Sequence, residues 1–223
     1  MIRVRVSTIE QFRKVCLTDW ATEAELSAYL RAGQEGEANW KMRAGTAFHH
    51  CLDNPEGTCL PEVREHWSGG FGFPADYIAA QLEDLGPGQR EVTARKRFDL
   101  TADCPWLRCM VEVKGTADFA CGLGLADDKT KFSTPAPQDY ENSLQWRWYL
   151  HLFDAWSFQY RLHPFKDPAG GERGLCIPRG EPLTFNLYRY DDLEADCLFW
   201  LVELLCWAKT ARLLYCLETS YKP

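Results

Sequence analysis

Four short motifs with polar or ionisable side chains follow one another along the chain. In chain order they are Gly45-Thr46-Ala47-Phe48-His49, Gly115-Thr116-Ala117-Asp118, Asp127-Asp128-Lys129-Thr130 and Gln145-Trp146-Arg147-Trp148-Tyr149. Each motif alone is a weak signal. Together they supply an imidazole, carboxylates, an ammonium group and a glutamine–tyrosine pair, which are the groups needed to hydrolyse a phosphodiester with a bound divalent metal.

The two middle motifs are expected on neighbouring strands. Residues 108–114 alternate between apolar and polar side chains, as a half-buried strand does, and Asp118 follows this stretch. Gly115 would allow a bend or a close backbone approach between them. The short apolar run 121–126 predicts a second strand, which leads directly into Asp127.

The alternation of side chains along a strand indicates which residues of the third motif point together. Residues two apart share a face, so Asp127 and Lys129 should project together while Asp128 points to the other side. With Asp118 nearby, two carboxylates and an ammonium group would occupy one small volume. Two like charges held this close are costly unless a cation lies between them. Carboxylate oxygens are ligands that suit Mg²⁺ or Mn²⁺. The alternative to a metal site is that each aspartate lies in a structural turn.

The histidine of the first motif is expected on a helix over residues 38–52, where apolar and aromatic side chains recur at roughly helical spacing. His49 and Asp53 are four residues apart and share a helix face. A histidine on such a helix is usually a structural residue. In combination with the aspartates, the sequence favours an imidazole that completes a set of metal ligands.

The fourth motif is expected on the next helix, over residues 138–154. Gln145 and Tyr149 are four residues apart, so their side chains lie on one face and can hydrogen-bond a phosphate oxygen, a base edge or the neighbouring lysine. We expect both to face the metal site, with Trp146 and Phe153 packed on other sides of the helix. The alternative is an amphipathic helix that keeps Tyr149 in the core.

In this order the motifs resemble those of the PD-(D/E)XK nuclease superfamily, in its RecB-like branch with a histidine in the first motif. They are more closely similar to the phage and prophage recombination exonucleases related to exodeoxyribonuclease VIII. The resemblance runs over residues 41–156, roughly half of the chain. It implies an α/β fold with a central mixed β-sheet flanked by helices, which is a restriction-endonuclease-like core. The order of expected strands and helices favours the same class.

The resemblance also implies roles for the residues that match its motifs. His49, Asp118 and Asp127 would bind the metal, together with the backbone carbonyl of Asp128. Lys129 would support the attacking water, so that Lys129, Asp118 and Asp127 are the expected catalytic residues. Many members of the superfamily have glutamate where this chain has Asp127, and the shorter side chain is tolerated there.

Four further residues are expected to hold DNA. Gln145 and Tyr149 match the Q-x-x-x-Y motif of the same family. Lys131 and Arg147 lie beside the motifs and add positive charge. A run of charges is usually a solvated face, so their role is inferred from their neighbours.

The expected activity is that of a metal-dependent deoxyribonuclease, an exonuclease in phage-type recombination or DNA processing, with Mg²⁺ or Mn²⁺ as cofactor. Endonuclease activity stays open beside it. The resemblance also implies that a single-strand annealing protein is a possible partner and that the chain can form a homo-oligomer. The alternative is a catalytically silent DNA-binding or protein-interaction module on the same fold.

Composition narrows the class of protein. The chain has 223 residues, of which 46% are hydrophobic and 13% aromatic, so we expect a globular protein. A net charge of −7 argues against a protein that merely coats nucleic acid, but active-site carboxylates contribute to this charge in a nuclease. No apolar run reaches the length of a membrane span, and residues 1–6 read as a strand rather than a signal peptide. We therefore expect a cytoplasmic protein with no membrane partner.

The ten cysteines are scattered singly, without a C-x-x-C pair, which indicates reduced and mostly buried thiols. Some RecB-like relatives hold an iron–sulfur cluster with one upstream cysteine and a tight C-terminal group. Cys197, Cys206 and Cys216 are too widely spaced for this and fall on an apolar helix. We therefore expect no iron–sulfur cluster.

We expect a single domain over residues 1–223. It has an N-terminal helical part over about 8–85, a sheet and active-site core over about 90–190, and a C-terminal helix over about 191–217. The polar, glycine-rich stretch up to residue 73 is predicted to be a mobile loop near the site. Strands are expected at 2–7, 91–100, 108–114, 121–127, 157–163 and 182–190, and further helices from about 9, from about 22 and over 74–85.

Overall fold

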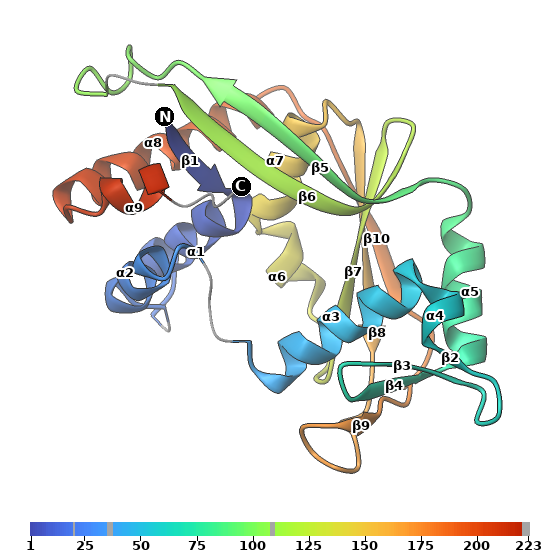
Figure 1. Ribbon diagram of the computed structural model, residues 1–223. Coiled ribbons are helices and arrows are strands. Elements are labelled where there is room, and N and C mark those ends of the chain that lie inside the picture. Colours follow the sequence, from blue (N-terminus) through green and yellow to red (C-terminus); the bar gives the residue numbers. More distant parts are fainter. Residues whose placement is uncertain (20, 35–37, 108–109, 220–223) are drawn as a thin grey trace.

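The computed structural model describes residues 1–19, 21–34, 38–107 and 110–219, and Figure 1 shows their arrangement. The chain folds into an α/β structure with a mixed central sheet flanked by helices, so the predicted fold class is confirmed. The strands of the central sheet are β1 (Ile2–Arg5), β5 (Gln89–Phe98), β6 (Val111–Cys121), β7 (Gly124–Lys131), β8 (Ser157–Pro164) and β10 (Leu183–Tyr188).

The sheet forks beside β6. One edge of β6 pairs with β5 in antiparallel register, from Val111 to Ala120. The other edge pairs with β1 in parallel register at residues 111–114 and with β7 in antiparallel register at residues 119–121. The β6–β7 pairing ends at Ala126, after which β7 continues in parallel register beside β8. Asp118 of β6 and Asp127 of β7 lie next to Phe119 and Ala126, where the pairing of these two strands ends.

The helices surround this sheet, as Figure 1 shows. α1, α7 and α8 pack together on β1 and β6, whereas α3 packs on β7 and α5 packs beside α3. Local capping explains where several helices begin; at α2, Thr22 and Glu25 form a reciprocal capping box. The helices are α1 (Val6–Leu17), α2 (Glu23–Arg31), α3 (Trp40–Asp53), α4 (Pro55–Thr58), α5 (Ala75–Leu85), α6 (Pro137–Glu141), α7 (Leu144–Leu152), α8 (Leu193–Thr210) and α9 (Leu214–Thr219).

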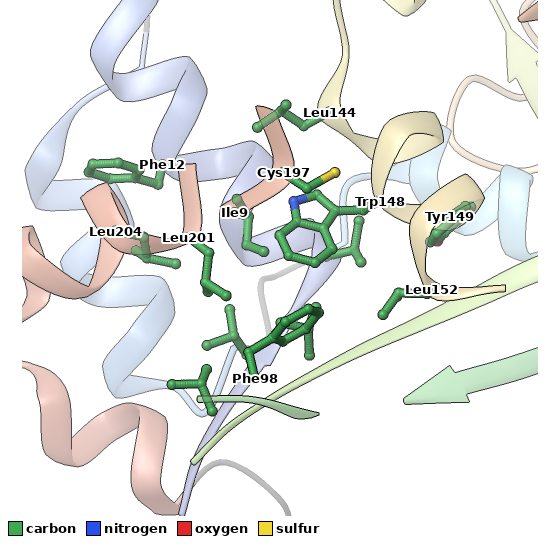
Figure 2. Close-up of a cluster of buried hydrophobic side chains, with 14 of the residues drawn as sticks. Ile9, Phe12, Phe98, Leu144, Trp148, Tyr149, Leu152, Cys197, Leu201 and Leu204 are labelled. Carbon is green, nitrogen blue, oxygen red and sulfur yellow. The ribbon is translucent and has the colours of Figure 1, made fainter. Parts of the chain in front are cut away.

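The main hydrophobic core fixes α7 in place. Figure 2 shows Trp148 of α7 among side chains from α1, β5 and α8, including Ile9, Phe98 and Leu201. Most residues of α7 are buried, because this short helix carries large apolar side chains on several of its sides. Truncating a buried tryptophan such as Trp148 costs about 3–5 kcal/mol in typical cores. The orientation of Gln145 and Tyr149 is therefore set by the core.

The expected mobile loop before residue 73 is wrong. This stretch instead forms strands of a small second sheet, in which Gly69 and Gly70, both with positive φ, make the two-residue turn between β3 and β4. Phe71 and Phe73 alternate inward and pack on Phe48 of α3 and its surroundings. The strands of this sheet are β2 (Cys59–Leu60), β3 (Glu65–Ser68), β4 (Phe71–Pro74) and β9 (Gly174–Leu175).

Two helices that we expected to be continuous are each divided. The predicted helix 138–154 divides at Ser143, because its hydroxyl caps α7 by accepting from the Gln145 N–H. The predicted helix 191–217 ends at Thr210, because Arg212 adopts a left-handed conformation with φ of 59° and the Leu213 N–H returns to the Ala208 carbonyl.

Residues 108 and 109, where we expected a strand to begin, lie outside the described residues, and β6 is described from Val111. Cys197 and Cys206 lie on α8 and Cys216 on α9, and the cysteines that the structure describes are free thiols. Among the described helices, none combines the length and apolar character needed to cross a bilayer.

Gly115 allows α7 to approach β6 at the fork. A Cβ atom at this position would lie 2.7 Å from a ring carbon of Tyr149 and 3.0 Å from a methyl carbon of Leu152. Real side chains do not tolerate the shorter of these contacts without a shift of the ring. The absence of a side chain at Gly115 is thus required by the packing of α7 on the strand.

We expect Gly115→Ala to lower the free energy of unfolding by about 1–3 kcal/mol, because overpacking forces α7 away from the strand. Urea denaturation measures this change. Gly180→Ala is the control, because a Cβ atom at Gly180 would meet nothing within 4 Å, and it should change stability by less than about 0.5 kcal/mol. Equal stability of both variants would contradict this account of the packing.

Candidate active site

α3 carries His49 to the fork. The helix lies close to β7 because Gly45 has no side chain; a Cβ atom there would lie 3.2 Å from Thr130 Oγ1. His49 Nε2 is 2.8 Å from the backbone oxygen of Asp128, and Nδ1 is 3.5 Å from Asp118 Oδ1. Side chains from α3 and β6 and a carbonyl of β7 therefore meet at one point.

In the fork, the Asp118 carboxylate accepts the hydrogen bond that a paired β6 backbone would otherwise accept from β7. Its Oδ2 accepts a 2.9 Å hydrogen bond from the Asp128 N–H, a group that points away from β8 toward the gap between β6 and β7. Its Oδ1 faces His49. The carboxylate is thus held at two sides, by a main-chain donor and by an imidazole.

Asp127 and Lys129 project together, as the alternation of a strand predicts. Lys129 Nζ lies 2.5 Å from Asp127 Oδ2, and Asp127 is 1% exposed. Gln145 of α7 donates from Nε2 to Asp127 Oδ1 at 3.2 Å. The carboxylate of Asp128 points to the opposite side of β7, where it contacts the buried Arg161 guanidinium and His163 imidazole of β8.

Gln145 and Tyr149 face this group of charges from α7. The Gln145 amide also donates to Tyr149 Oη at 3.2 Å, so one amide connects Asp127 with the phenol. Burial, followed by the nearby Asp127 carboxylate, raises the pKa of Tyr149 to about 12. Tyr149 therefore carries its proton at neutral pH. Trp146 lies on another side of the helix, where its indole N–H donates to the Glu141 carbonyl.

The two carboxylates at the fork hold protons more tightly than usual. Burial raises the pKa of Asp118 to about 6, with a further rise from the Asp128 charge, against the opposing effect of Lys129. Burial likewise raises the pKa of Asp127 to about 7, although Lys129 acts against this. Both shifts have one physical cause, which is negative charge in a site with little solvent. A cation placed beside these groups would reverse the shift.

Lys129 and Asp128 are both held in their charged forms. Burial alone would lower the pKa of Lys129, but the Asp127 and Asp118 carboxylates outweigh it and raise the pKa. Burial alone would raise the pKa of Asp128, but its hydrogen bond to His163 and the charge of Arg161 outweigh it and lower the pKa. Of the three aspartates, Asp128 is therefore the one whose pKa is lowered.

Two grooves meet at Lys129. The first, with a volume of about 710 Å³, lies along α3 and includes Lys41, His49 and Asp128. The second, of about 770 Å³, lies between α1 and α6. Lys131 lines the second groove, and its Nζ lies 4.7 Å from the centre of the Tyr140 ring. Lys129 is therefore reached by solvent from both grooves.

Arg147 lies apart from the other predicted residues. Its Nε donates to Tyr190 Oη at 3.1 Å and its Nη1 donates to the Ser143 carbonyl at 2.8 Å. Its guanidinium also covers the ring of Trp146 at 4.6 Å. These contacts hold α7 to neighbouring segments, so the structure does not bring Arg147 to the group at the fork.

Three basic residues near the site were not predicted from the sequence: Arg161 and His163, which are fully buried, and Arg90, which is partly buried. Arg90 of β5 pairs with Asp53 and lies 3.8 Å from Asp128 Oδ2. Arg161 and His163 of β8 contact the same aspartate. The alternation of Arg161 and His163 on a predicted strand was a usable signal, because a buried strand rarely carries two basic residues without a partner.

The donor atoms at the fork fit a small divalent cation in part. Neighbouring ligands of an octahedral Mg²⁺ at about 2.0–2.1 Å lie roughly 3 Å apart, and His49 Nε2 and the Asp128 oxygen are separated by 2.8 Å. Asp118 Oδ1 is a nearby anionic donor, 3.5 Å from the other ring nitrogen of His49, Nδ1. In the described part of the chain, no three His, Cys, Asp or Glu side chains surround one point. Two facts account for this: one of the expected ligands is the backbone carbonyl of Asp128, and the Asp127 carboxylate is paired with Lys129.

Comparison with solved structures shows a shared fold. The alkaline exonuclease LHK-Exo from Laribacter hongkongensis superposes with a TM-score of 0.50 at 16% identity, over 96% of this chain and 90% of that chain. LHK-Exo in complex with dAMP gives a TM-score of 0.50 at 15% identity, over 95% and 90% of the two chains. The protein SSO0001 gives 0.51 at 12% identity, over 93% and 77%. At these identities the likeness concerns the fold alone.

The sequence matches no protein-family model and no curated protein. The likeness to known proteins is therefore one of structure. This chain has the fold of an alkaline exonuclease. What the residues at the fork do is a separate question, which depends on their chemistry.

The raised pKa of Asp118 predicts how stability depends on pH in the absence of divalent cations. The folded pKa of about 6 exceeds the ordinary value of 3.8, so the folded state binds this proton more tightly than the unfolded state does. The contribution of Asp118 to the free energy of unfolding should therefore fall as pH rises from about 4 to about 6, and stay lower above it. Asp118→Asn, which keeps an oxygen for the Asp128 N–H, should gain about 2 kcal/mol over wild type at pH 7.5 and nothing at pH 4.

Urea denaturation in EDTA at the two pH values tests this expectation. Asp103→Asn, at an exposed site, is the control and should change stability little at either pH. An Asp118→Asn variant that is less stable than wild type at pH 7.5 would instead assign this carboxylate a purely structural role.

Proposed function

We propose that this protein is a metal-dependent deoxyribonuclease of the PD-(D/E)XK superfamily, in its RecB-like branch. The observation that carries the proposal is the meeting of four motifs at one fork of the sheet. His49, Asp118 and the Asp128 carbonyl lie together there, and the Asp127–Lys129 pair is held by Gln145. These residues are far apart in the sequence, and their types match a phosphodiester hydrolase.

His49, Asp118, Asp127 and the Asp128 carbonyl would hold Mg²⁺ or Mn²⁺. A bound divalent cation supplies Lewis-acid chemistry, polarising the scissile phosphate and stabilising the charge that develops on it. The raised pKa values of Asp118 and Asp127 support this role, because crowded carboxylates have most to gain from a cation. To bind the cation, Asp127 would share its carboxylate between the ion and Lys129.

Lys129 would act on the water and on the phosphate. Its ammonium group stays charged beside Asp127, so it can donate hydrogen bonds to an attacking water or to a phosphoryl oxygen. It cannot take up a proton in that form. Lys129 is about one-third exposed and lies where the two grooves meet, which is where a scissile phosphate would have to lie.

A DNA strand would run through the two grooves and pass Lys129. Lys41 lines one groove, and Lys131 and Arg13 line the other, so cationic side chains lie on both sides of the site for contact with phosphates. Gln145 would hold Asp127 and Lys129 in register with the strand. This positioning uses the fixed orientation of α7 in the core.

We further propose that the enzyme is an exonuclease of phage-type recombination or DNA processing. The order of the motifs supports this assignment, as does the fold shared with the alkaline exonuclease LHK-Exo, one structure of which holds dAMP. A single-strand annealing protein and further copies of this chain are partners that the same resemblance implies. A catalytically silent DNA-binding module is the other outcome of the assay below.

The wild-type protein should degrade end-labelled linear DNA with Mg²⁺ or Mn²⁺, leave closed circular DNA intact, and be inactive in EDTA. Lys129→Ala should lower the rate by about a hundredfold or more, because an electrostatic contact to the reacting phosphate is lost. Cleavage of circular DNA would replace the exonuclease with an endonuclease. DNA binding without cleavage under all metal conditions would favour the silent module.

Gln145→Ala should slow DNA turnover by about tenfold to a hundredfold while leaving the affinity for Mn²⁺ unchanged, because a positioning contact is lost rather than a ligand. Steady-state kinetics and isothermal titration with Mn²⁺ measure the two quantities. Gln11→Ala, at an exposed position of α1, is the control. A loss of Mn²⁺ affinity would place Gln145 among the metal ligands, and no change in either quantity would return α7 to a purely structural role.

A further inference from the structure

A charged cluster lies buried on the side of β7 that faces away from Lys129. Asp128, Arg161 and His163 form it, and each is 0% exposed. His163 Nε2 donates to Asp128 Oδ1 at 2.8 Å, and Arg161 Nη1 lies 3.1 Å from the same oxygen. Asp128 and Arg161 are direct neighbours in the parallel register of β7 and β8.

α5 holds this cluster from outside the sheet. Tyr77 Oη donates to His163 Nδ1 at 3.0 Å, which matches the tautomer with its proton on Nε2. Arg161 Nη2 donates to Gln81 Oε1 at 2.7 Å and lies 3.2 Å from Asp84 Oδ2. The three residues of α5 are spaced by four and by three, so one face of the helix supplies all of these contacts.

Stability alone does not account for such a cluster. Burying charges is costly, and replacing a buried ionic group by apolar residues of similar volume is often neutral or stabilising. Its location offers another reason. Asp128 lies between Asp127 and Lys129, and its own N–H and carbonyl contact Asp118 and His49.

The Asp128 peptide groups are therefore held from both sides. On one side, the carboxylate is fixed by Arg161 and His163. On the other, the carbonyl oxygen faces His49, in the gap where β6 no longer pairs with β7. β8 pairs with this part of β7 but β6 does not, so the carboxylate contacts are a further means of setting the orientation of the carbonyl.

We propose that Arg161, His163 and Tyr77 are positioning residues, which act through the Asp128 carboxylate to aim its backbone carbonyl and the Asp118 contact at the metal site. The proposal rests on the proposed function, since it concerns the cation of that site. It adds a chain of contacts from α5 through β8 to the metal ligands. None of these three residues would touch DNA or the reacting phosphate.

The test is the affinity for Mn²⁺, measured by isothermal titration, in the double variant Tyr77→Phe/His163→Phe. Removing both partners of a buried hydrogen bond and keeping ring shapes preserves folding better than removing one. Asp128 then loses its hydrogen bond from His163, and Mn²⁺ binding should weaken by roughly tenfold, as for other residues that orient metal ligands. Tyr77→Phe alone should weaken binding in the same direction by a smaller factor, and it serves if the double variant does not fold.

The matched control is Thr58→Val/His66→Phe. Thr58 Oγ1 and His66 Nδ1 form a similarly buried 3.0 Å hydrogen bond in the segment around the small sheet, without contact to Asp128. This control should bind Mn²⁺ as wild type does. Thermal melts of all variants show whether a change in affinity merely follows a change in stability.

Unchanged Mn²⁺ affinity in the folded double variant would overturn the positioning role while leaving the proposed function intact. An equal loss in the control would overturn it too, because the effect would then be a general one of core disruption. A wild-type protein that binds no Mn²⁺ would overturn both the positioning role and the metal-dependent activity.

Discussion

Compensation of negative charge at the fork of the sheet is the constraint on which the surrounding structure depends. Asp118, Asp127 and Asp128 lie within one small region of low solvent access, and the charge of each carboxylate is compensated by different partner groups. Asp128 is paired with Arg161 on one side of β7, and Asp127 with Lys129 on the other. Asp118 receives a main-chain N–H and an imidazole, which leaves its pKa raised. A divalent cation beside Asp118 would complete this arrangement.

The fork itself connects the fold with the chemistry. If β7 stayed paired with β6, the Asp128 N–H and carbonyl would serve as ladder partners and would be closed to side chains. Because the two strands separate after Ala126, Asp118 takes the N–H and His49 reaches the carbonyl. The same opening admits Tyr149 of α7 against Gly115. A break in regular pairing is thus the feature that allows three elements to meet.

Local rules of sequence predicted the parts of this site that depend on one element. The shared face of Asp127 and Lys129 follows from the period of a strand, and that of Gln145 and Tyr149 from the period of a helix. The Gly69-Gly70 pair also indicates a two-residue hairpin turn, and for this reason the prediction of a mobile loop before residue 73 was wrong. The contacts of Arg147 and the pairing of Asp128 with β8 depend on which segments pack together, so no spacing within the sequence specifies them.

The most direct test of the central claim is anomalous diffraction from crystals of the protein grown with Mn²⁺. The account predicts one strong anomalous peak at the fork, within about 2.0–2.3 Å of His49, Asp118 and the Asp128 carbonyl oxygen. Lys129 should remain beside Asp127 in that structure. No peak at the fork in crystals that contain Mn²⁺, with His49 still hydrogen-bonded to the Asp128 carbonyl, would contradict the account.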